Sequence, residues 1–392
     1  MDIKSPAFQI ILNRPGGGYA DTGELASWEN SIGSCITSFC LEDKETALDI
    51  CEFMIANDYG LHTDGPWFGK DNYIVARWGY ADDPGGWQER TMMIKSLDVD
   101  YPESGYPTIK VTATDLSASM TEVVVTKMWK KESPGYTYAD IAREIAGKYG
   151  LEPKVMDTIG THSYIAQDNK SDMNFLIELA DKAKYEGGAG FACYVENREL
   201  HFHKRDKEMA PIMSLTYATD KSGMLKSFKP QTIEYHGSPS AKQITAIGID
   251  PRTKEVVEDK SKSSTSDVTF IDGESGKIVD NPSASETNIV PPASTTGKDK
   301  ADADLDSMSI RVITATATTI GTPLLHAKAN IEILGVGLFS RIYYIEHVRH
   351  TINDSGYTCE LELRSDPSMM GGGAGGGGTD GKKPDMTVID AE

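Results

Sequence analysis

Two histidine pairs are the first residues in this chain whose spacing could support chemistry. His201 and His203 stand two apart in an expected strand, so their side chains share one face and could bind a metal ion. No third ligand is visible nearby, and the adjacent Lys204 favours a solvated face. His347 and His350 stand three apart, which places them on opposite faces of a strand. We therefore expect no metal site.

Paired carboxylates are what a glycoside hydrolase requires. Asp98 with Asp100, and Glu332 with Glu346, are such pairs, but 59 acidic residues produce pairs by chance. The Pro-Gly-Gly-Gly run at residues 15–18 lacks the Gly-Lys-Ser/Thr of a phosphate-binding loop, and neither GxSxG nor HExxH occurs. We expect no catalytic residue and no cofactor-binding residue, and we predict that the protein is not an enzyme.

Charge and cysteine usage restrict the partners and the compartment. The net charge of −20 disfavours nucleic acid as a bound ligand, because most of the surface would repel phosphates. It is compatible with DNA that passes without binding. The longest apolar run, residues 333–339, is too short to span a membrane, and no signal peptide is recognisable at the start. Five cysteines without a CxxC pair indicate reduced thiols, as in a cytoplasm: Cys35, Cys40, Cys51, Cys193 and Cys359.

Hydrophobic alternation and turn residues predict a mainly β fold with an α+β insert. Residues 1–120 are expected to form a first, tube-like antiparallel β-barrel, because six short β-rich runs alternate with Gly, Pro and Asp turns. Residues 121–208 are expected to form an α/β middle domain with two helices and a hairpin. Thr137 and Asp140 have the spacing of a helix capping box, and Gly150 stands where that helix should end.

The rest of the chain returns to β-structure with one long interruption. Residues 209–250 and 308–367 are expected to form a second, similar barrel. The polar composition of residues 251–307 predicts an insertion loop between its two parts. Seven glycines within residues 371–378 indicate that residues 368–392 form a flexible tail.

One strand-turn-strand sequence occurs twice, at residues 92–115 and 343–366, with Ser-Gly-Tyr at both turns. After the turn the two apolar patterns differ by one position. A one-residue slip would turn every apolar side chain of a strand outward. We therefore interpret Pro107 as one extra residue, a bulge beside the first turn. Without it, Ile109, Val111 and Ala113 align with Cys359, Leu361 and Leu363.

The middle of the chain resembles a known family. Residues 165–180, followed by the hairpin at 194–202, are similar to the middle domain of phage late control protein D, a family of baseplate hub proteins related to the hub region of VgrG spikes. The second repeat looks like the closing module of these proteins, with a Gly-Val-Gly at residues 335–337 before His350 and a Gly-Tyr turn. The likeness covers residues 8–366.

This resemblance implies a structural protein of the phage tail baseplate. Two similar small antiparallel β-barrels would flank the α/β domain, and a homotrimer would form a ring of pseudo-six-fold symmetry. The ring would adapt a hexameric tail tube to a trimeric central spike and let DNA pass. Implied partners are the tail tube protein and the central spike protein, with wedge or other baseplate proteins and the tape measure as further candidates. Such a protein is located in the virion after assembly in the host cytoplasm.

Two details of the family are also expectations. VgrG spikes carry an OB-fold and a β-helical needle after the hub region, and the 26 residues after Asp366 are too few for either, so we expect a separate spike protein. If acidic residues line the channel, they would repel passing DNA. A neutral or basic lumen would contradict this hypothesis.

Two other classes of function stay open. A tail-associated cell-wall (peptidoglycan) hydrolase would require a lysozyme-like or peptidase module, which is not readable in this sequence. A carbohydrate-binding β-protein would use exposed Trp28, Trp67 and Trp87. These tryptophans stand beside Gly and Pro turns, so packing of loops also explains them.

Overall fold

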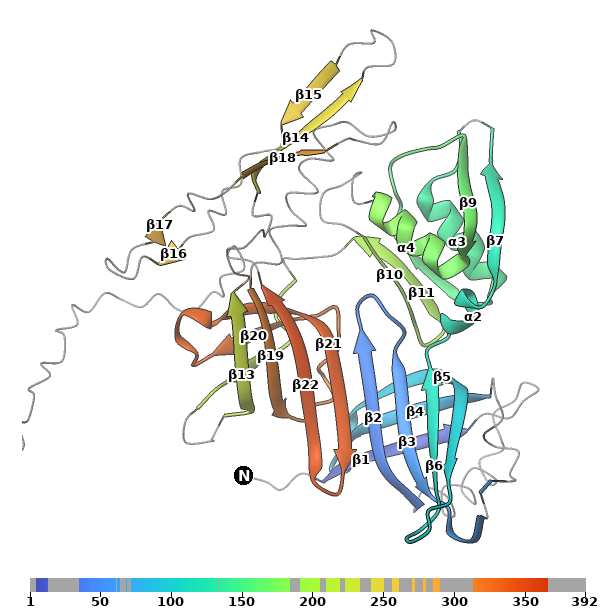
Figure 1. The fold of residues 1–392 in the computed structure, drawn as a ribbon, viewed down its shortest axis with the longest axis vertical. Helices are drawn as coiled ribbons and strands as arrows, with labels where there is room; N and C mark the ends of the chain where they lie inside the picture. The colour runs from blue at the N-terminus through green and yellow to red at the C-terminus, as the bar shows by residue number, and fades with distance from the viewer. Residues whose placement is uncertain are drawn as a thin grey trace, which may run out of the picture.

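The computed structural model describes residues 5–12, 35–60, 62–63, 68, 72–132, 134–183, 191–204, 209–218, 223–232, 241–249, 256–260, 270–271, 278–279, 285–289 and 313–365. Its main element is a twelve-stranded sheet (Figure 1). Six strands come from the first part of the chain: β1 (Pro6–Leu12), β2 (Ile36–Lys44), β3 (Ile50–Ala56), β4 (Tyr73–Tyr80), β5 (Asp83–Asp100) and β6 (Thr108–Thr114). Six come from the last part: β12 (Ser214–Thr216), β13 (Leu225–Thr232), β19 (Ile313–Ile320), β20 (Asn330–Leu334), β21 (Arg341–Asn353) and β22 (Gly356–Ser365).

Both parts of the chain belong to one continuous sheet. Its strands follow the order β1-β4-β5-β6-β3-β2-β21-β22-β19-β13, and β12 and β20 attach beside β21. The junction is the antiparallel pair β2–β21, from Phe39 opposite Ile352 to Lys44 opposite His347. The sequence predicted two separate barrels, whereas the pairing gives a single sheet. A strand edge presents unpaired N–H and C=O groups, and here two such edges satisfy each other.

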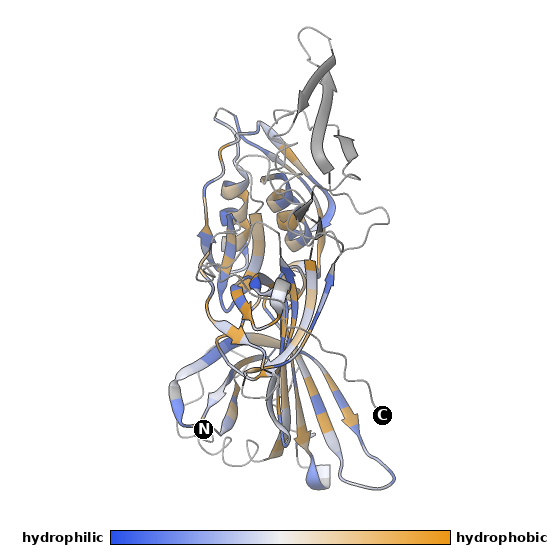
Figure 2. Ribbon diagram, turned by 90° about the vertical axis from the view of Figure 1, so that its left-hand side faces the viewer, coloured by the Kyte–Doolittle hydropathy of each residue, from blue (hydrophilic) through white to orange (hydrophobic). Residues whose placement is uncertain are grey.

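One hydrophobic core lies on the inner face of this sheet. Apolar and polar residues alternate along the strands, as a half-buried sheet requires (Figure 2). Phe39 of β2, Trp78 of β4 and Ile345 of β21 are buried in the same cluster, and the rings of Phe39 and Trp78 lie 6.1 Å apart. Each such side chain contributes about 1.5–3 kcal/mol on burial. The two parts of the chain therefore stabilise each other.

The repeat extends beyond the hairpin seen in the sequence. The order β4-β5-β6-β3-β2 in one half recurs as β20-β21-β22-β19-β13 in the other. Ile94 faces Ala113 and Ile345 faces Leu363, which confirms the predicted alignment. Both copies also have a register shift directly after the repeated isoleucine.

The extra residue of the first copy lies in its turn. Gly105 and Gly356 have the same φ of 109°, a conformation that glycine adopts without strain. Pro107 belongs to the loop before β6, and its carbonyl accepts a hydrogen bond from the Asn57 N–H. The interpretation of Pro107 as a bulge is therefore wrong. The bulges occur at Lys95 and Glu346, where they accentuate the bend of the two long strands.

The middle part of the chain contains helices α2 (Ala118–Thr121), α3 (Tyr138–Lys148) and α4 (Asp172–Ala183). Strands β8 (Glu152–Val155), β10 (Phe191–Glu196) and β11 (Glu199–Lys204) form one small sheet, and β7 (Val124–Lys130) pairs with β9 (Tyr164–Ser171). The predicted capping box is confirmed, because Thr137 Oγ1 accepts from the Asp140 N–H and Asp140 accepts from the Thr137 N–H. Gly150 ends this segment with φ +65°.

The connection from β13 to β19, residues 233–312, takes the place of the short turn between β2 and β3. It contains β14 (Ala241–Ile249), β15 (Val256–Lys260) and β18 (Ser285–Ile289) in one small sheet, and the pair β16 (Phe270–Ile271) and β17 (Ile278–Val279). The sequence had assigned β14 to the second barrel, and its pairing places it in the insertion instead. The predicted tail at 368–392 lies outside the described residues. No helix in the described part of the chain has the length and apolarity to cross a membrane.

Candidate functional site

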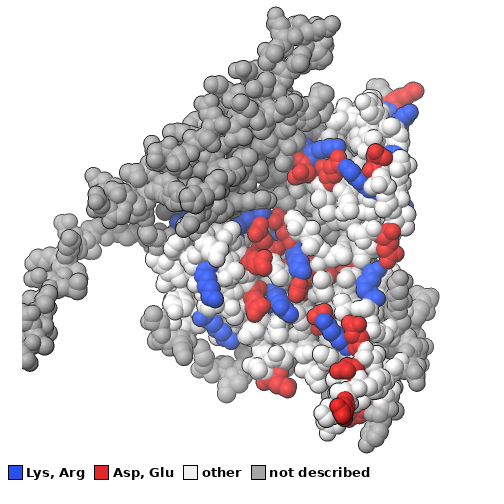
Figure 3. Space-filling view, in the orientation of Figure 1, with Lys and Arg blue, Asp and Glu red and all other residues white. Residues whose placement is uncertain are grey.

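The outer face of the continuous sheet is polar and crosses both halves of the chain. Strand alternation places Glu42 of β2 opposite Arg349 of β21, which is opposite Glu360 of β22. One row further, Lys44 lies opposite His347, and His347 lies opposite Glu362. Threonines of β19 continue both rows. The result is a polar surface on which acidic and basic side chains lie beside one another (Figure 3).

Ion pairs join neighbouring strands on this face. Glu42 binds Lys44 at 2.6 Å and lies 3.7 Å from Arg349, while His347 lies 3.5 Å from Glu362. Partial burial raises the pKa of Glu42, but the Lys44 hydrogen bond and the nearby His347 and Arg349 charges lower it to below its usual value. Such exposed pairs each contribute only about 0–1 kcal/mol. These ion pairs therefore determine the charge pattern of the outer face and add little to the stability of the fold.

Acidic side chains outnumber basic ones on the outer face. The fully exposed charges there are almost all carboxylates, and most of the lysines and arginines are partly covered by ion pairs. The acidic residues include Glu42, Glu52, Glu89, Asp98, Asp100, Glu360 and Glu362, and the basic ones include Lys44, Arg77, Lys110, Lys229 and Arg349. A face of this kind weakly repels phosphate groups.

A buried ionic junction lies at the inner end of the same strands. Asp43 points into the core side of β2, where its Oδ1 accepts a 2.8 Å hydrogen bond from Lys328 Nζ and its Oδ2 accepts from the Ala327 N–H. Arg90 of β5 lies 3.7 Å from the same carboxylate. Burial raises the pKa of Asp43, but Lys328 and Arg90 outweigh burial and hold that pKa below its usual range. The junction therefore holds a charged carboxylate in the interior.

The junction also holds the middle domain against the sheet. Arg90 binds Glu196 of β10 at 3.0 Å, and the Thr91 N–H donates to Asn197 in the following turn. Lys328 Nζ lies 4.5 Å from the centre of the Tyr194 ring, a cation–π contact. Because these contacts come from both halves of the sheet and from the middle domain, the junction fixes all three relative to one another.

A second ionic group reinforces the sheet beside this junction. Arg364 of β22 donates to Glu346 at 2.6 Å and to Glu45 at 2.9 Å, and the Tyr344 hydroxyl donates to Glu45. Glu45 follows β2, so this group again joins the first part of the chain to the last. Losing one member of such a buried group leaves an unpaired charge, which is costly.

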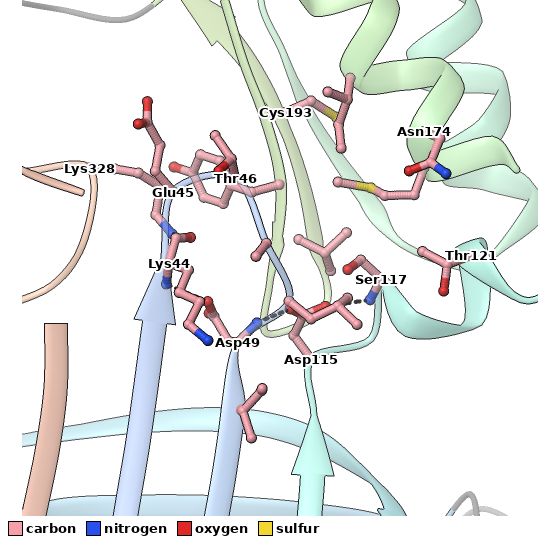
Figure 4. A pocket seen from close by; sticks show the side chains of 17 residues that line it. Lys44, Glu45, Thr46, Asp49, Asp115, Ser117, Thr121, Asn174, Cys193 and Lys328 are labelled. Carbon is pink, nitrogen blue, oxygen red and sulfur yellow. Dashed lines mark hydrogen bonds between the residues drawn. The ribbon is translucent and has the colours of Figure 1, made fainter. Parts of the chain in front are cut away.

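A cleft of about 370 Å³ opens between the β2–β3 turn and the middle domain (Figure 4). Asp49 and Asp115 lie on its wall, and burial raises the pKa of both carboxyls. Backbone donors bind both oxygens of Asp115 and one oxygen of Asp49. Asp115 accepts from the N–H groups of Asp49 and Ser117, and Asp49 accepts from the Lys44 N–H. These hydrogen bonds stabilise the turns that follow β2 and β6. We therefore assign Asp49 and Asp115 a structural role.

The sequence of the chain matches the model of one protein family. A family model described as the Alg8 N-terminal domain matches residues 94–354, two thirds of the chain. The chain belongs to this family. The family's description names no reaction, so membership by itself assigns no activity. No curated protein matches the chain in sequence.

The chain is also similar to several solved structures. The tail protein from Neisseria meningitidis MC58 has a TM-score of 0.63 at 12% identity, covering 93% of this chain and 98% of that one. The 43 kDa tail protein of prophage MuSo2 from Shewanella oneidensis has a TM-score of 0.61 at 14% identity, covering 93% and 100%. The Francisella PdpA-VgrG complex, half-lidded, has a TM-score of 0.55 at 11% identity, covering 94% of this chain and 58% of that one. At these identities the likeness shows a shared fold.

The histidines have structural partners. His201 stacks on Tyr194 with ring centres 4.7 Å apart, and His203 Nε2 lies 3.2 Å from the Tyr194 hydroxyl. His350 is buried between the Leu325 carbonyl and the Tyr357 hydroxyl, and burial lowers its pKa to about 4. His347 lies on the opposite, polar face, as the spacing predicted. Within the described residues, no three His, Cys, Asp or Glu side chains are placed to hold a metal ion.

The carboxylate pairs do not converge on a common point. Asp98 and Asp100 lie on the outer face of β5, while Glu332 accepts a hydrogen bond from Ser214 and Glu346 from Arg364. Trp87 donates from its indole N–H to the Tyr80 carbonyl within the β4–β5 hairpin, so this ring packs locally. Trp28 and Trp67 lie outside the described residues. The five cysteines all fall in described segments, and none of them forms a disulfide there.

Sequence reasoning missed the junction of Asp43, Arg90 and Lys328. One signal was available, because Asp43 continues the inward positions of β2 after Phe39 and Leu41. A carboxylate at an inward position requires a buried cation. The identity of that cation was not readable, since Lys328 precedes β20 at the far end of the chain and has an unusual φ of +71°.

Proposed function

We propose that this protein is a structural hub of a phage tail baseplate. Three copies would form a ring in which each chain supplies two related halves, giving six similar units with three-fold symmetry. The carrying observation is the duplicated five-strand order within one continuous sheet. Such a ring would meet a six-fold tail tube on one side and a three-fold central spike on the other. The fold shared with two tail proteins supports this proposal.

The polar outer face is the surface that we assign to the channel of the ring. A channel for DNA should bind phosphates weakly, since each lysine or arginine contact with a phosphate adds affinity. The outer face carries more carboxylates than cations, so its charge is negative and repels phosphates, as such a channel requires. The apolar face is occupied by the core, so it is unsuited to a water-filled passage.

The proposed partners are a second and third copy of the chain, the tail tube protein and the spike protein. Wedge proteins, other baseplate proteins and the tape measure are further candidates. The proposal places the protein in the virion tail after assembly in the host cytoplasm. It includes no catalytic step, and it gives Asp49 and Asp115 of the cleft the role of holding the turns through their backbone hydrogen bonds.

Light scattering on the purified chain tests the proposal. The chain has a mass of 42.7 kDa, and the hub requires a particle of about three times that mass. Electron microscopy of the same sample should show rings with a central opening. A monomer at all concentrations, alone and with the spike protein, would contradict the hub. Clearing of peptidoglycan in a zymogram would instead support the alternative of a cell-wall hydrolase.

A further inference from the structure

The pairing of β2 with β21 inside the chain buries three residues of β21. Val348, His350 and Ile352 have exposed fractions of 0%, 1% and 3%. Each faces the core side of β2, and His350 lies opposite Leu41. Strand β21 is long enough to pair with β20 along its first residues and with β2 along its last ones.

The equivalent residues of the first half are exposed. Because Ile94 and Ile345 occupy the same place in the two hairpins, Leu97 corresponds to Val348, Val99 to His350 and Tyr101 to Ile352. The exposed fractions of Leu97, Val99 and Tyr101 are 39%, 39% and 60%. In the described part of the chain, β4 reaches only to Met93 along β5, and no strand continues beside residues 96–100. Among the described strands, residues 96–100 therefore present an unpaired edge with apolar side chains, and the hydroxyl of Tyr101 just beyond it lies 3.0 Å from Thr63 Oγ1.

The counterpart of β2 is also an open edge. Leu41 pairs with Cys51, which pairs in turn with Ala113. In the second half Pro230 pairs with Ala315, which pairs with Leu363, the equivalent of Ala113. Pro230 therefore corresponds to Leu41. By the same register Phe228 corresponds to Phe39. Among the described strands, β13 pairs only with β19, and an isolated bridge joins its first residue, Leu225, to Tyr217, outside residues 228–232. The end of β5 is thus the counterpart of β21, and β13 is the counterpart of β2. Within the described chain these two counterparts are not paired with each other.

We propose that β13 of one subunit pairs antiparallel with the end of β5 of the next subunit, repeating the internal β2–β21 junction. This inference rests on the proposed ring and names its subunit interface. The internal register fixes the pairs, and on the apolar side they are Phe228 with Tyr101 and Pro230 with Val99. Aromatic and aliphatic cross-strand pairs of this kind stabilise sheets.

The polar side of the same register is complementary in charge. Lys229 falls opposite Asp100, and Gln231 falls opposite Asp98. Lys229 is the only lysine or arginine among the described residues of β13 that falls within the paired register, and it meets a carboxylate. Pro230 lacks an N–H, which is tolerated at the edge of a sheet and means one hydrogen bond fewer than an unbroken ladder.

A charge reversal tests the register. Lys229→Glu should weaken subunit association about tenfold or more, because it places a second carboxylate opposite Asp100. The double variant Lys229→Glu with Asp100→Lys should restore association. Lys154→Glu, on the middle domain and fully exposed, is the matched control and should leave association unchanged. Circular dichroism on each variant checks that the chain is folded.

A cysteine cross-link gives an independent measurement. Lys229→Cys with Asp100→Cys should form intermolecular disulfides on mild oxidation, and the products should stop at the trimer on a non-reducing gel. Ser227→Cys with Asp98→Cys is the control, since the register separates these positions by four residues, about 13 Å along the strand. Equal cross-linking of both pairs would overturn the register.

The outcomes separate this inference from the proposed function. If the wild-type chain forms trimers and Lys229→Glu associates equally well, the interface lies elsewhere and the pairing is refuted while the hub stands. If the wild-type chain stays monomeric with and without spike protein, the proposed function itself fails. Weakened association in the single variant and recovery in the double variant would establish the pairing.

Discussion

Lys328 Nζ donates a 2.8 Å hydrogen bond to Asp43 Oδ1, although 285 residues separate the two in the chain. Arg90 and Tyr194 surround the same pair, so one buried contact joins both halves of the sheet and the middle domain. Burial lowers the pKa of Lys328, but Asp43 outweighs burial and raises that pKa above its usual value. Both members are therefore charged across the physiological range.

Removing the cation of this pair should be strongly destabilising. We expect Lys328→Met to reduce the free energy of unfolding by about 3–5 kcal/mol, because it leaves the Asp43 carboxylate buried without its main partner. The double variant Asp43→Asn with Lys328→Met should recover part of this loss, since the amide still accepts from the Ala327 N–H. Urea unfolding measures both. A single variant within about 0.5 kcal/mol of wild type would contradict a structural role for the pair.

His350 should make stability fall as the solution becomes acidic. Burial holds its pKa near 4 in the folded protein, below the value of about 6.5 in the unfolded chain. Between these two values the unfolded state binds more protons, so the free energy of unfolding decreases as the pH falls from 6.5 towards 4. The full effect is ~3 kcal/mol.

His350→Gln isolates this contribution because its amide does not titrate in that range. We expect the variant to be less stable at pH 7 but to lose less stability than wild type between pH 6.5 and 4. Thermal unfolding at a series of pH values measures the difference. Parallel pH profiles for the two proteins would show that His350 does not control this slope.

Gly321 should not tolerate a side chain. A Cβ at this position would lie 2.0 Å from Cγ of the ring of Tyr357, a buried residue of β22. We expect Gly321→Ala to destabilise the fold by about 1–3 kcal/mol through overpacking. Gly147→Ala is the control, because a Cβ there meets no atom within 4 Å and the residue lies inside α3. That change should stabilise by up to about 1 kcal/mol, measured as a rise in the unfolding temperature.

The acidic outer face should exclude DNA. We expect Glu360→Lys with Glu362→Lys to increase binding of duplex DNA and to make it steeply dependent on salt, because each new cation can contact a phosphate. Glu152→Lys with Glu199→Lys, on the middle domain, changes the net charge equally and should increase binding less. Fluorescence anisotropy at several salt concentrations compares them. Equal affinities would contradict the assignment of the outer face to the channel.

Local signals in the sequence account for most strands and helices. Apolar alternation located β2 to β6 and β21 to β22, and Thr137 with Asp140 marked the start of α3, because these features depend on neighbouring residues alone. The repeated Ser-Gly-Tyr also fixed the correspondence of the two hairpins. The sequence further predicted that His347 and His350 face opposite sides of their strand.

The tertiary structure decided which strand edges meet and which charges share the interior. Edge pairing uses backbone C=O groups, which every residue carries, and N–H groups, which only proline lacks. The residue types of β2 therefore did not indicate that β21 is its partner. The same holds for β14, whose strand character was readable and whose separation from the main sheet was not. Asp43, Arg90 and Lys328 meet only because that edge pairing brings distant segments together. The sequence by itself therefore determined the repeated unit, and the fold alone determined how the two copies join.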